Sequence, residues 1–364
     1  MGTPQPLRVI ELYSGIGGMH WALQESGMDY GIVAAMDIHA GANAVYQHNF
    51  PCAPSKARNI LSLTAQELNA LQPTAMVMSP PCQPFTRVGL KLDVDDPRSS
   101  SFLHLLKLLP TIPSLDFIFV ENVVGFEVSL MRDQLVDSLQ QCQIYFREFL
   151  LSPRDCGIPN SRARYYLVGR RHADFSWPAD LLKEYPFCLC EPEQHNCKLP
   201  RRFFSSYTRP PGLVPQRALK AYLEDIDEEE LKSYILSDKV LERHYYVLDI
   251  RTPEDDHTCC FTKAYTHYAE GTGSVLQHNG NVDWKRVCAE VAQAQTSGQQ
   301  DVALEKLRSL QLRYFTPREV SNLMGFPHDF SFPKHVSNKA RYKMLGNSLN
   351  VQVVALLLQL WHSE

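Results

Sequence analysis

Short apolar runs alternate with helix-like segments along the first half of the chain. Predicted strands cover 7–12, 32–36, 75–78, 116–120 and 165–168, and predicted helices cover 19–26, 42–48, 102–109 and 132–142. Strands that alternate with helices typically form a parallel sheet with helices on both faces. The sequence therefore predicts a doubly wound α/β sheet over residues 7–170.

Glycine and reactive polar residues follow the predicted strands of this sheet. Gly15, Asp37, Cys82 and Glu121 each come just past the end of a predicted strand. In open α/β sheets, ligands bind at the edge where the carboxyl ends of the strands meet. The pattern predicts one site at this edge, assembled from four separate segments.

The pattern changes after about residue 178. Proline-rich sequence near 186–217 predicts an irregular linker, residues 218–236 look helical, and residues 257–276 look strand-like with glycine breaks. From Phe315 the helical pattern returns, and a buried helix is expected over 351–361.

We interpret this organisation as a catalytic domain that is interrupted by a smaller domain. The first part of the catalytic domain covers 1–180, the inserted domain covers 181–310, and residues 311–364 complete the catalytic domain.

Composition limits the classes of protein that this chain can belong to. No run of about 18 apolar residues occurs and the N-terminal sequence lacks the pattern of a signal peptide, so no membrane partner is expected. The 10 cysteines are therefore expected to be free thiols in a reducing compartment. We expect a cytoplasmic protein, and a nuclear location stays open because no clear basic localisation run occurs.

Two further features bear on ligands. Cys188, Cys190 and Cys197 surround His195 without the paired spacing of a zinc site, so no metal is expected. The net charge of −4 argues against broad nonspecific binding of nucleic acid, but it leaves room for a local basic groove.

The turn Ser14-Gly-Ile-Gly-Gly18 follows the first predicted strand. Glycines there let backbone amides approach a ligand at a helix N-terminus, and Asp37 lies where a ribose hydroxyl is bound in such folds. The turn suits an adenosine-containing cofactor, although a purely structural turn is the alternative. His20 replaces the third glycine of the dinucleotide pattern, so a single nucleoside fits better.

The stretch SPPCQPF, residues 79–85, places one cysteine among three prolines. Proline fixes φ and removes a backbone donor, which predicts a stiff loop that presents Cys82 in one direction. Such a thiol beside an adenosine site suggests covalent catalysis. Glu121 is either a proton donor or a structural cap, and Arg162 and Arg164 lie on one face of an extended segment.

Together these stretches resemble the cytosine-5 methyltransferase family. Five segments match its blocks in order: ELYSGIGG the S-adenosylmethionine loop, SPPCQPFTR the nucleophile loop, ENVVGFE the glutamate block, NSRARYYLVG the arginine block, and LGNSLNVQVV the C-terminal block. The resemblance implies a Rossmann-like methyltransferase sheet with a smaller inserted target-recognition domain.

Within that family, the chain is most similar to the tRNA-type branch. This similarity rests on Cys-Phe-Thr at 260–262 and on LRYFTPREVSNLMGFP at 312–327. Members of this branch methylate cytosine 38 in the anticodon loop of aspartate tRNA. The resemblance therefore implies tRNA as the partner, weak or no activity on DNA, and a monomer.

The resemblance also implies a mechanism. The Cys82 thiolate attacks C6 of cytosine, and Glu121 hydrogen-bonds N3 and the exocyclic amine. Arg162 and Arg164 hold the base and favour the thiolate, after which C5 takes the methyl group and loss of the C5 proton expels Cys82.

The resemblance assigns two further sets of residues. The S-adenosylmethionine set is Tyr13, Ser14, Gly15, Gly17, Gly18, Asp37, Ile38, Asn59, Ile60, Ser79, Pro80, Asn347, Ser348 and Val351. The RNA-binding set is Arg87, Lys263, Arg341 and Lys343, for which ordinary surface charge is the alternative.

The sequence departs from the family at two of these blocks. Asn59 stands where most relatives carry an acidic residue for the adenine amine, and Val124 stands where close relatives place a lysine. Cys260 is expected either to assist the chemistry or to pack and position the RNA.

Three other hypotheses remain. The first is the same chemistry on DNA, which the modest insertion and the negative charge disfavour. The second is a silent binding scaffold, which the intact Cys82, Glu121, Arg162 and Arg164 disfavour. The third is a dehydrogenase, which is disfavoured because no residues downstream of the glycine turn suit hydride transfer.

Overall fold

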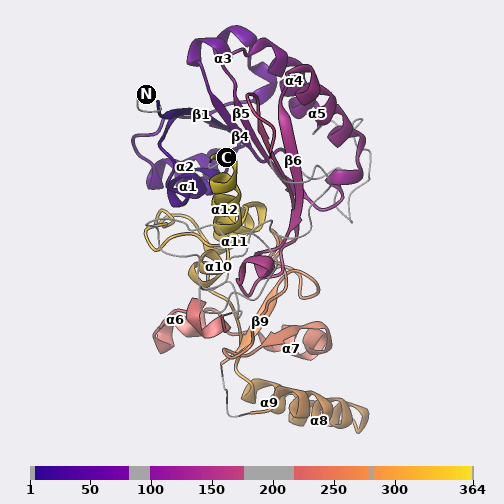
Figure 1. Ribbon diagram of the computed structural model, residues 1–364. Helices are drawn as coiled ribbons and strands as arrows, with labels where there is room; N and C mark the ends of the chain where they lie inside the picture. The colour runs from indigo at the N-terminus through magenta and orange to yellow at the C-terminus, as the bar shows by residue number, and fades with distance from the viewer. Residues whose placement is uncertain (1–4, 82–98, 176–216, 279, 281, 363–364) are drawn as a thin grey trace, which may run out of the picture.

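The computed structural model describes residues 5–81, 99–175, 217–278, 280 and 282–362 (Figure 1). Its centre is a seven-stranded sheet in the order β3-β2-β1-β4-β5-β7-β6, and a second sheet has the order β10-β9-β8. The strands are β1 (Leu7–Leu12), β2 (Tyr30–Asp37), β3 (Ser55–Ala57), β4 (Ala75–Met78), β5 (Phe117–Val123), β6 (Tyr145–Leu151), β7 (Arg164–Arg170), β8 (Asp249–Arg251), β9 (Ser274–Gln277) and β10 (Leu312–Tyr314).

Helices cover both faces of the large sheet and fill the smaller part of the molecule. They are α1 (Gly18–Ser26), α2 (Ala40–Asn49), α3 (Ala65–Leu71), α4 (Ser100–Leu108), α5 (Leu130–Gln141), α6 (Glu228–Lys232), α7 (Asp238–His244), α8 (Trp284–Thr296), α9 (Gln300–Ser309), α10 (Pro317–Leu323), α11 (Asn338–Asn347) and α12 (Val351–His362). In the described part of the chain, no helix has the length and apolar character needed to span a membrane.

The large sheet separates two apolar cores because neighbouring residues in a strand point to opposite faces. In β1, Val9 contributes to the core under α1, α2 and α12, whereas Ile10 contributes to the core under α3, α4 and α5. Figure 1 shows these two groups of helices on opposite sides of the sheet, with the last helix, α12, packed beside the first. The predicted doubly wound α/β sheet is confirmed.

All strands of the large sheet are parallel except β7, which is antiparallel to β5 and to β6. The predicted strands at 7–12 and 75–78 are confirmed. The sequence pattern did not indicate β3, which has only three residues, or β6, whose residues YFREFLL interrupt the apolar pattern with Arg147 and Glu148. The expectation that Glu121 follows its strand is wrong, because β5 continues through Val123 and pairs Glu121 with Tyr166.

The prediction of one helix over 218–236 is wrong. Backbone groups there hydrogen-bond to other segments: the Leu219 N–H donates to the Asp255 carbonyl, and the Tyr234 carbonyl accepts from the Tyr314 N–H. Only the five residues of α6 are α-helical there. These tertiary hydrogen bonds override the local helical pattern.

The prediction of strand over 257–276 is also wrong for most of its length, because only Ser274–Gln277 forms a strand within the described part. The preceding residues form a compact loop, which the Thr262 N–H closes by donating to the Thr272 carbonyl.

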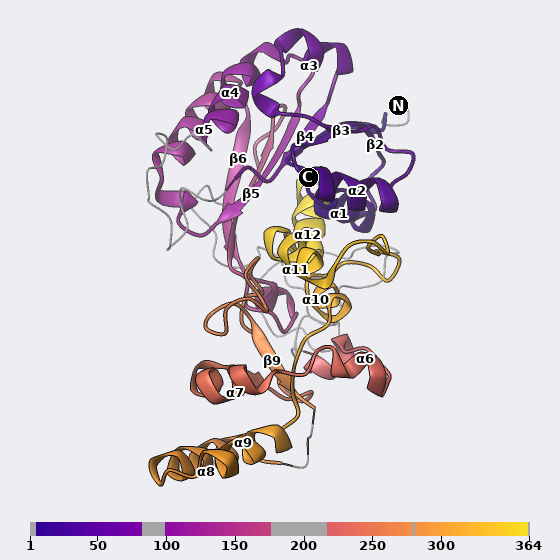
Figure 2. The ribbon, with the colours of Figure 1, turned by 180° about the vertical axis from the view of Figure 1, so that it is seen from behind.

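The smaller part has its own apolar core, built from residues of α7, α8, α9 and the second sheet. The paired helices α8 and α9 lie at the end of the molecule remote from the large sheet (Figure 2). β10 follows position 311 directly and pairs with β9, so the second sheet includes a strand from the predicted C-terminal part. The domain boundaries at 180 and 310 stay predictions, and the predicted linker near 186–217 lies outside the described residues up to position 216.

Candidate functional site: the carboxyl edge of the large sheet

The strand order of the large sheet reverses direction between β1 and β4. β2 and β3 continue on one side of this pair, and β5 continues on the other. Loops that leave the carboxyl ends of β1 and β4 therefore diverge, which opens a crevice where ligands bind in this kind of sheet. The glycine turn leaves β1 at this point, and Ser79 and Pro80 leave β4.

The glycine turn has a backbone that few other residue types adopt. Gly15 and Gly17 have φ of 52° and 88°, and a Cβ added to Gly17 would lie 2.7 Å from the Phe50 ring. The Gly15 N–H donates to Asp37 Oδ2 at 2.9 Å, and the His39 N–H donates to Asp37 Oδ1 at 2.8 Å. Asp37 thus joins the ends of β1 and β2 at the place where its carboxylate was predicted to meet a ribose.

The C-terminal block lies directly against the glycine turn. A Cβ added to Gly18 would lie 3.0 Å from Ser348 Oγ and 3.1 Å from Leu349 Cγ. Asn347 is exposed, and the Val351 side chain is buried in the core. The two ends of the predicted cofactor set, more than 300 residues apart in the sequence, therefore meet in space.

Apolar side chains border the other end of the crevice. Ile38 is 71% exposed and Leu61 is 44% exposed, so both offer apolar surface to a flat ring. Asn59 Oδ1 accepts the Leu61 N–H at 3.0 Å and so caps a short 3-10 helix over Ile60–Ser62. The Ile60 side chain packs in the core, which leaves only its backbone for a ligand.

One buried polar atom of the turn supports a ligand in this crevice. Ser14 Oγ is buried and has no hydrogen-bond partner among the residues that the structure describes. A buried hydroxyl without a partner is costly, and a bound polar group would satisfy it. The residues of the crevice therefore fit a nucleoside-containing cofactor such as S-adenosylmethionine.

Glu121 and Arg164 form a pair beside this crevice. Arg164 Nε lies 3.4 Å from Glu121 Oε1, and the Glu121 side chain is largely buried. Burial raises the pKa of Glu121, although the charges of Arg164 and Arg162 oppose this effect. A carboxyl group with a raised pKa takes up a proton more readily than an exposed carboxyl group, which suits hydrogen bonding to a substrate.

Arg162 lies in a different environment from Arg164. Its guanidinium is buried and donates to the Phe261 carbonyl at 3.1 Å, to the Gly346 carbonyl at 3.0 Å and to the Ser348 carbonyl. These hydrogen bonds tie the arginine block to the 260–262 segment and to the C-terminal block. Arg162 thus holds three segments of the site together, a role that the sequence did not indicate.

Cys260 lies at the same junction. Arg162 Nη1 is 3.4 Å from Cys260 Sγ. Burial alone would raise the pKa of this thiol, but the guanidinium groups of Arg162 and Arg164 outweigh burial and lower the pKa. The junction therefore favours negative charge, whether on Cys260 or on a ligand.

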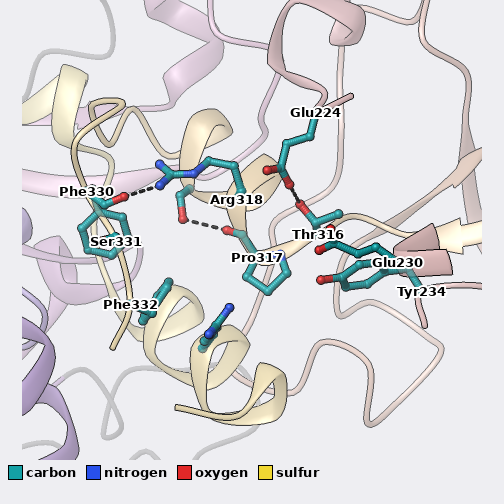
Figure 3. A pocket seen from close by; sticks show the side chains of 11 residues that line it. Glu224, Glu230, Tyr234, Thr316, Pro317, Arg318, Phe330, Ser331 and Phe332 are labelled. Atoms are coloured by element: carbon teal, nitrogen blue, oxygen red, sulfur yellow. Dashed lines mark hydrogen bonds between the residues drawn. The ribbon is translucent and has the colours of Figure 1, made fainter. Parts of the chain in front are cut away.

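The structure places the described residues of the predicted RNA-binding set in two different environments. Lys263 and Lys343 are exposed, and Lys343 shares one face of α11 with Lys339, four residues earlier. Arg341 lines a cavity of about 210 Å³ together with Phe332, Glu224 and Glu230. Figure 3 shows this cavity. Arg87 and Cys82 lie outside the described residues.

A buried polar chain under the glycine turn was not predicted. The Tyr46 hydroxyl donates to Glu11 Oε2 at 2.8 Å and lies 2.8 Å from His20 Nδ1. Burial raises the pKa of Glu11 to about 8 and lowers the pKa of His20 to about 4. A glutamate between apolar residues of a buried strand was the sequence signal that could have revealed this chain.

We expect Glu11→Gln to make stability less dependent on pH. The folded protein keeps the Glu11 proton up to about pH 8, whereas the unfolded chain releases it near the ordinary value of 4.5. Stability is therefore lost as the pH rises through this range, by at most about 5 kcal/mol at about 1.4 kcal/mol per pKa unit. Glutamine is neutral throughout, so the free energy of unfolding of the variant should exceed that of the wild type increasingly from pH 5 to pH 8.

Urea unfolding at pH 5, 6, 7 and 8 measures this difference. Glu228→Gln, at an exposed position in α6, is the control and should keep the pH dependence of the wild type. Parallel curves for the wild type and Glu11→Gln would show that Glu11 is ionised in the folded protein.

The fold and the site together define a Rossmann-like methyltransferase. The chain matches the family model of the C-5 cytosine-specific DNA methylases over residues 7–360. It is 41% identical to the tRNA (cytosine(38)-C(5))-methyltransferase of Bos taurus, over 98% of this chain and 99% of that protein.

Solved structures agree with this result. A crystal structure of a Spodoptera frugiperda DNMT2 mutant matches with a TM-score of 0.81 and 38% identity, covering 98% of this chain and 99% of that one. The structure of Schizosaccharomyces pombe Dnmt2 methyltransferase matches with a TM-score of 0.80 and 35% identity, covering 99% of both chains. The chain belongs to the C-5 cytosine-specific DNA methylase family, and it is a cytosine-C5 methyltransferase.

Proposed function

We propose that this enzyme transfers a methyl group from S-adenosylmethionine to C5 of cytosine 38 in the anticodon loop of aspartate tRNA. The observation that carries the chemistry is the buried Glu121, which pairs with Arg164 and lies beside Ser79 at the end of β4. The substrate proposal rests on the relatives that share about 40% identity along the whole chain and are named for cytosine 38 of tRNA.

Each group of the site has a chemical task in this proposal. S-adenosylmethionine, when bound along Ser14–Gly18, Asp37 and Ser348, supplies an electrophilic methyl group to C5. The protonated Glu121 donates to N3 and offsets the negative charge that develops in the ring. Arg164 orients Glu121, and Arg162 keeps the surrounding segments in register.

The covalent part of the mechanism is assigned to Cys82. Its thiolate forms a bond to C6, which moves electron density to C5 and makes C5 nucleophilic. After C5 is methylated, loss of the C5 proton to a base restores the C5–C6 double bond and releases the thiolate. The cytosine ring must be accessible from both faces during this reaction, and a nucleobase in an anticodon loop is extruded at little cost.

The exposed Lys263 and Lys343 are the proposed contacts to RNA phosphates, together with Arg87. For Arg341, the neighbouring Glu224 and Glu230 make a phosphate contact less favourable than at the two lysines. We also propose that the protein acts as a monomer in the cytoplasm, with a nuclear pool left open.

Transfer of labelled methyl groups tests the proposed substrate. Wild-type protein is incubated with labelled S-adenosylmethionine and unmodified aspartate tRNA, the same tRNA with uridine at position 38, or duplex DNA. We expect label only in the first. Equal labelling of the uridine-38 tRNA would refute the position, and label in DNA alone would replace the substrate while keeping the chemistry.

A further inference from the structure

The loop over 262–272 is held rigidly at both ends. The Thr262 N–H donates to the Thr272 carbonyl at 2.9 Å, and Thr272 Oγ1 donates to the Tyr268 carbonyl at 2.6 Å. The buried Tyr265 anchors the loop, since its hydroxyl donates to the Ser274 carbonyl at 2.7 Å and accepts the Phe315 N–H at 2.9 Å. Residues at the tip are thus presented in a fixed orientation.

The base of this loop touches the residues that form the site. The loop begins directly after Phe261, whose carbonyl accepts from Arg162. Lys263 packs so closely on Gly346 that a Cβ added to this glycine would lie 2.2 Å from Lys263 N. The loop therefore projects from the same junction that joins the arginine block to the C-terminal block.

Tyr268 is 64% exposed at the tip of this loop. Its ring makes an edge contact with His267, with centroids 4.6 Å apart, so one ring steadies the other. The charged groups nearest in the loop are Lys263 and Glu270, both exposed. An exposed aromatic ring alone carries little meaning, but a ring on a rigid loop beside a nucleotide site offers a stacking surface.

We propose that Tyr268 stacks on a base of the RNA substrate next to the target cytosine. Once the target base is extruded, its neighbours lose a stacking partner, and an aromatic ring compensates for that loss. Stacking does not depend on the identity of the base, so Tyr268 acts as a positioning residue that contributes affinity and register. This inference rests on the proposed RNA substrate.

Steady-state kinetics with aspartate tRNA test the inference. Removal of one aromatic stacking partner costs about 1–3 kcal/mol per base, which corresponds to a rise in KM of about 5- to 150-fold. Tyr268→Ala should show this rise with kcat within about twofold of the wild type, and Tyr268→Phe and Tyr268→Trp should restore KM.

The chain offers a matched control in Tyr246. This residue is 72% exposed and also makes an edge contact with its neighbour, Tyr245, but it belongs to a short 3-10 helix, Tyr245–Val247, outside this loop. Tyr246→Ala should keep the KM of the wild type. An equal rise in KM for both alanine variants would overturn the inference, because it would report a general loss of surface contacts.

Binding of abasic RNA substrates distinguishes a loss of base stacking in Tyr268→Ala from a structural effect of the substitution. RNA that lacks the base on one side of the target cytosine should bind the wild type and Tyr268→Ala equally, whereas RNA with that base should bind the wild type more tightly. If Tyr268→Ala loses the same affinity for every abasic RNA, no base stacks on Tyr268. Failure of the wild type to methylate any tRNA would instead refute the proposed function, and unchanged KM in Tyr268→Ala would refute this inference alone.

Discussion

Cys82→Ala is expected to lower methyl transfer by roughly 10⁴-fold or more, because no other group can replace a nucleophile that forms the covalent bond to C6. Cys82→Ser should fall as far, since a serine hydroxyl at neutral pH is far less ionised than a thiol. Both variants should still bind S-adenosylmethionine, since the glycine turn and Asp37 are unchanged. Transfer of labelled methyl groups and cofactor binding measure the two properties separately.

The covalent intermediate can be trapped to confirm this result. In tRNA with 5-fluorocytosine at position 38, C5 carries fluorine in place of hydrogen. Once the adduct is methylated in the presence of S-adenosylmethionine, C5 has no proton to lose, so the thiolate is not released. Wild-type protein should form a complex that survives denaturation, and Cys82→Ala should form none.

Cys260 supplies the most stringent control for this assignment. Its pKa is lowered by Arg162 and Arg164, so it is the described thiol best prepared to act as a nucleophile. Cys260→Ala should still form the trapped complex. If Cys260→Ala abolishes the complex while Cys82→Ala retains it, the catalytic roles of the two cysteines are reversed.

The sequence predicted the parts of the fold that local pattern determines. Leu7–Leu12 and Ala75–Met78 are short apolar runs with turn residues after them, and a buried strand is the structure that accommodates such a run. The glycine turn could also be identified from local sequence, since it is rich in glycine, and Gly15 and Gly17 have the positive φ that favours glycine. Failures came where distant segments decide the structure, as in 218–236, whose backbone pairs with residues near 253–255 and 312–314.

The site residues likewise divide into those that local sequence predicts and those that depend on distant segments. Asp37 and Glu121 could be predicted as site residues because they lie next to the ends of predicted strands. The structure places both at the carboxyl edge of the large sheet. The structural role of Arg162 could not be predicted from the sequence, because its hydrogen-bond partners are main-chain carbonyls at positions 261, 346 and 348. A main-chain carbonyl exists at every residue, so no sequence pattern marks the ones that a buried guanidinium will reach.

This junction explains how one site can be assembled from three segments that lie far apart in the sequence. Arg162 comes before the predicted inserted domain at 181–310, Phe261 lies within that predicted range, and Gly346 follows it. A single guanidinium suits this task because its donors form a planar fork that can reach several acceptors at once. A lysine offers one point charge and could not span the three segments.

Gly346→Ala is expected to break this junction. Gly346 lies in α11, where alanine would ordinarily be favoured over glycine by about 1 kcal/mol. A Cβ at this position, however, would lie 2.2 Å from both Lys263 N and the Thr262 carbonyl carbon. Both are main-chain atoms, so relief requires the 262–272 loop or α11 to move as a unit, which costs about 3 kcal/mol or more.

The expected result is therefore the reverse of what helix propensity predicts. Chemical denaturation should show Gly346→Ala less stable than the wild type, and methyl transfer should fall at least about 100-fold, since a shift of about 1 Å at a positioned site has an effect of this size. Gly31→Ala is the control, because no atom lies within 4 Å of the added Cβ in β2, and its stability should stay within about 1 kcal/mol of the wild type. A stable, active Gly346→Ala protein would mean that the loop and α11 are not in contact, and the loop that carries Tyr268 would then lack its connection to the C-terminal block.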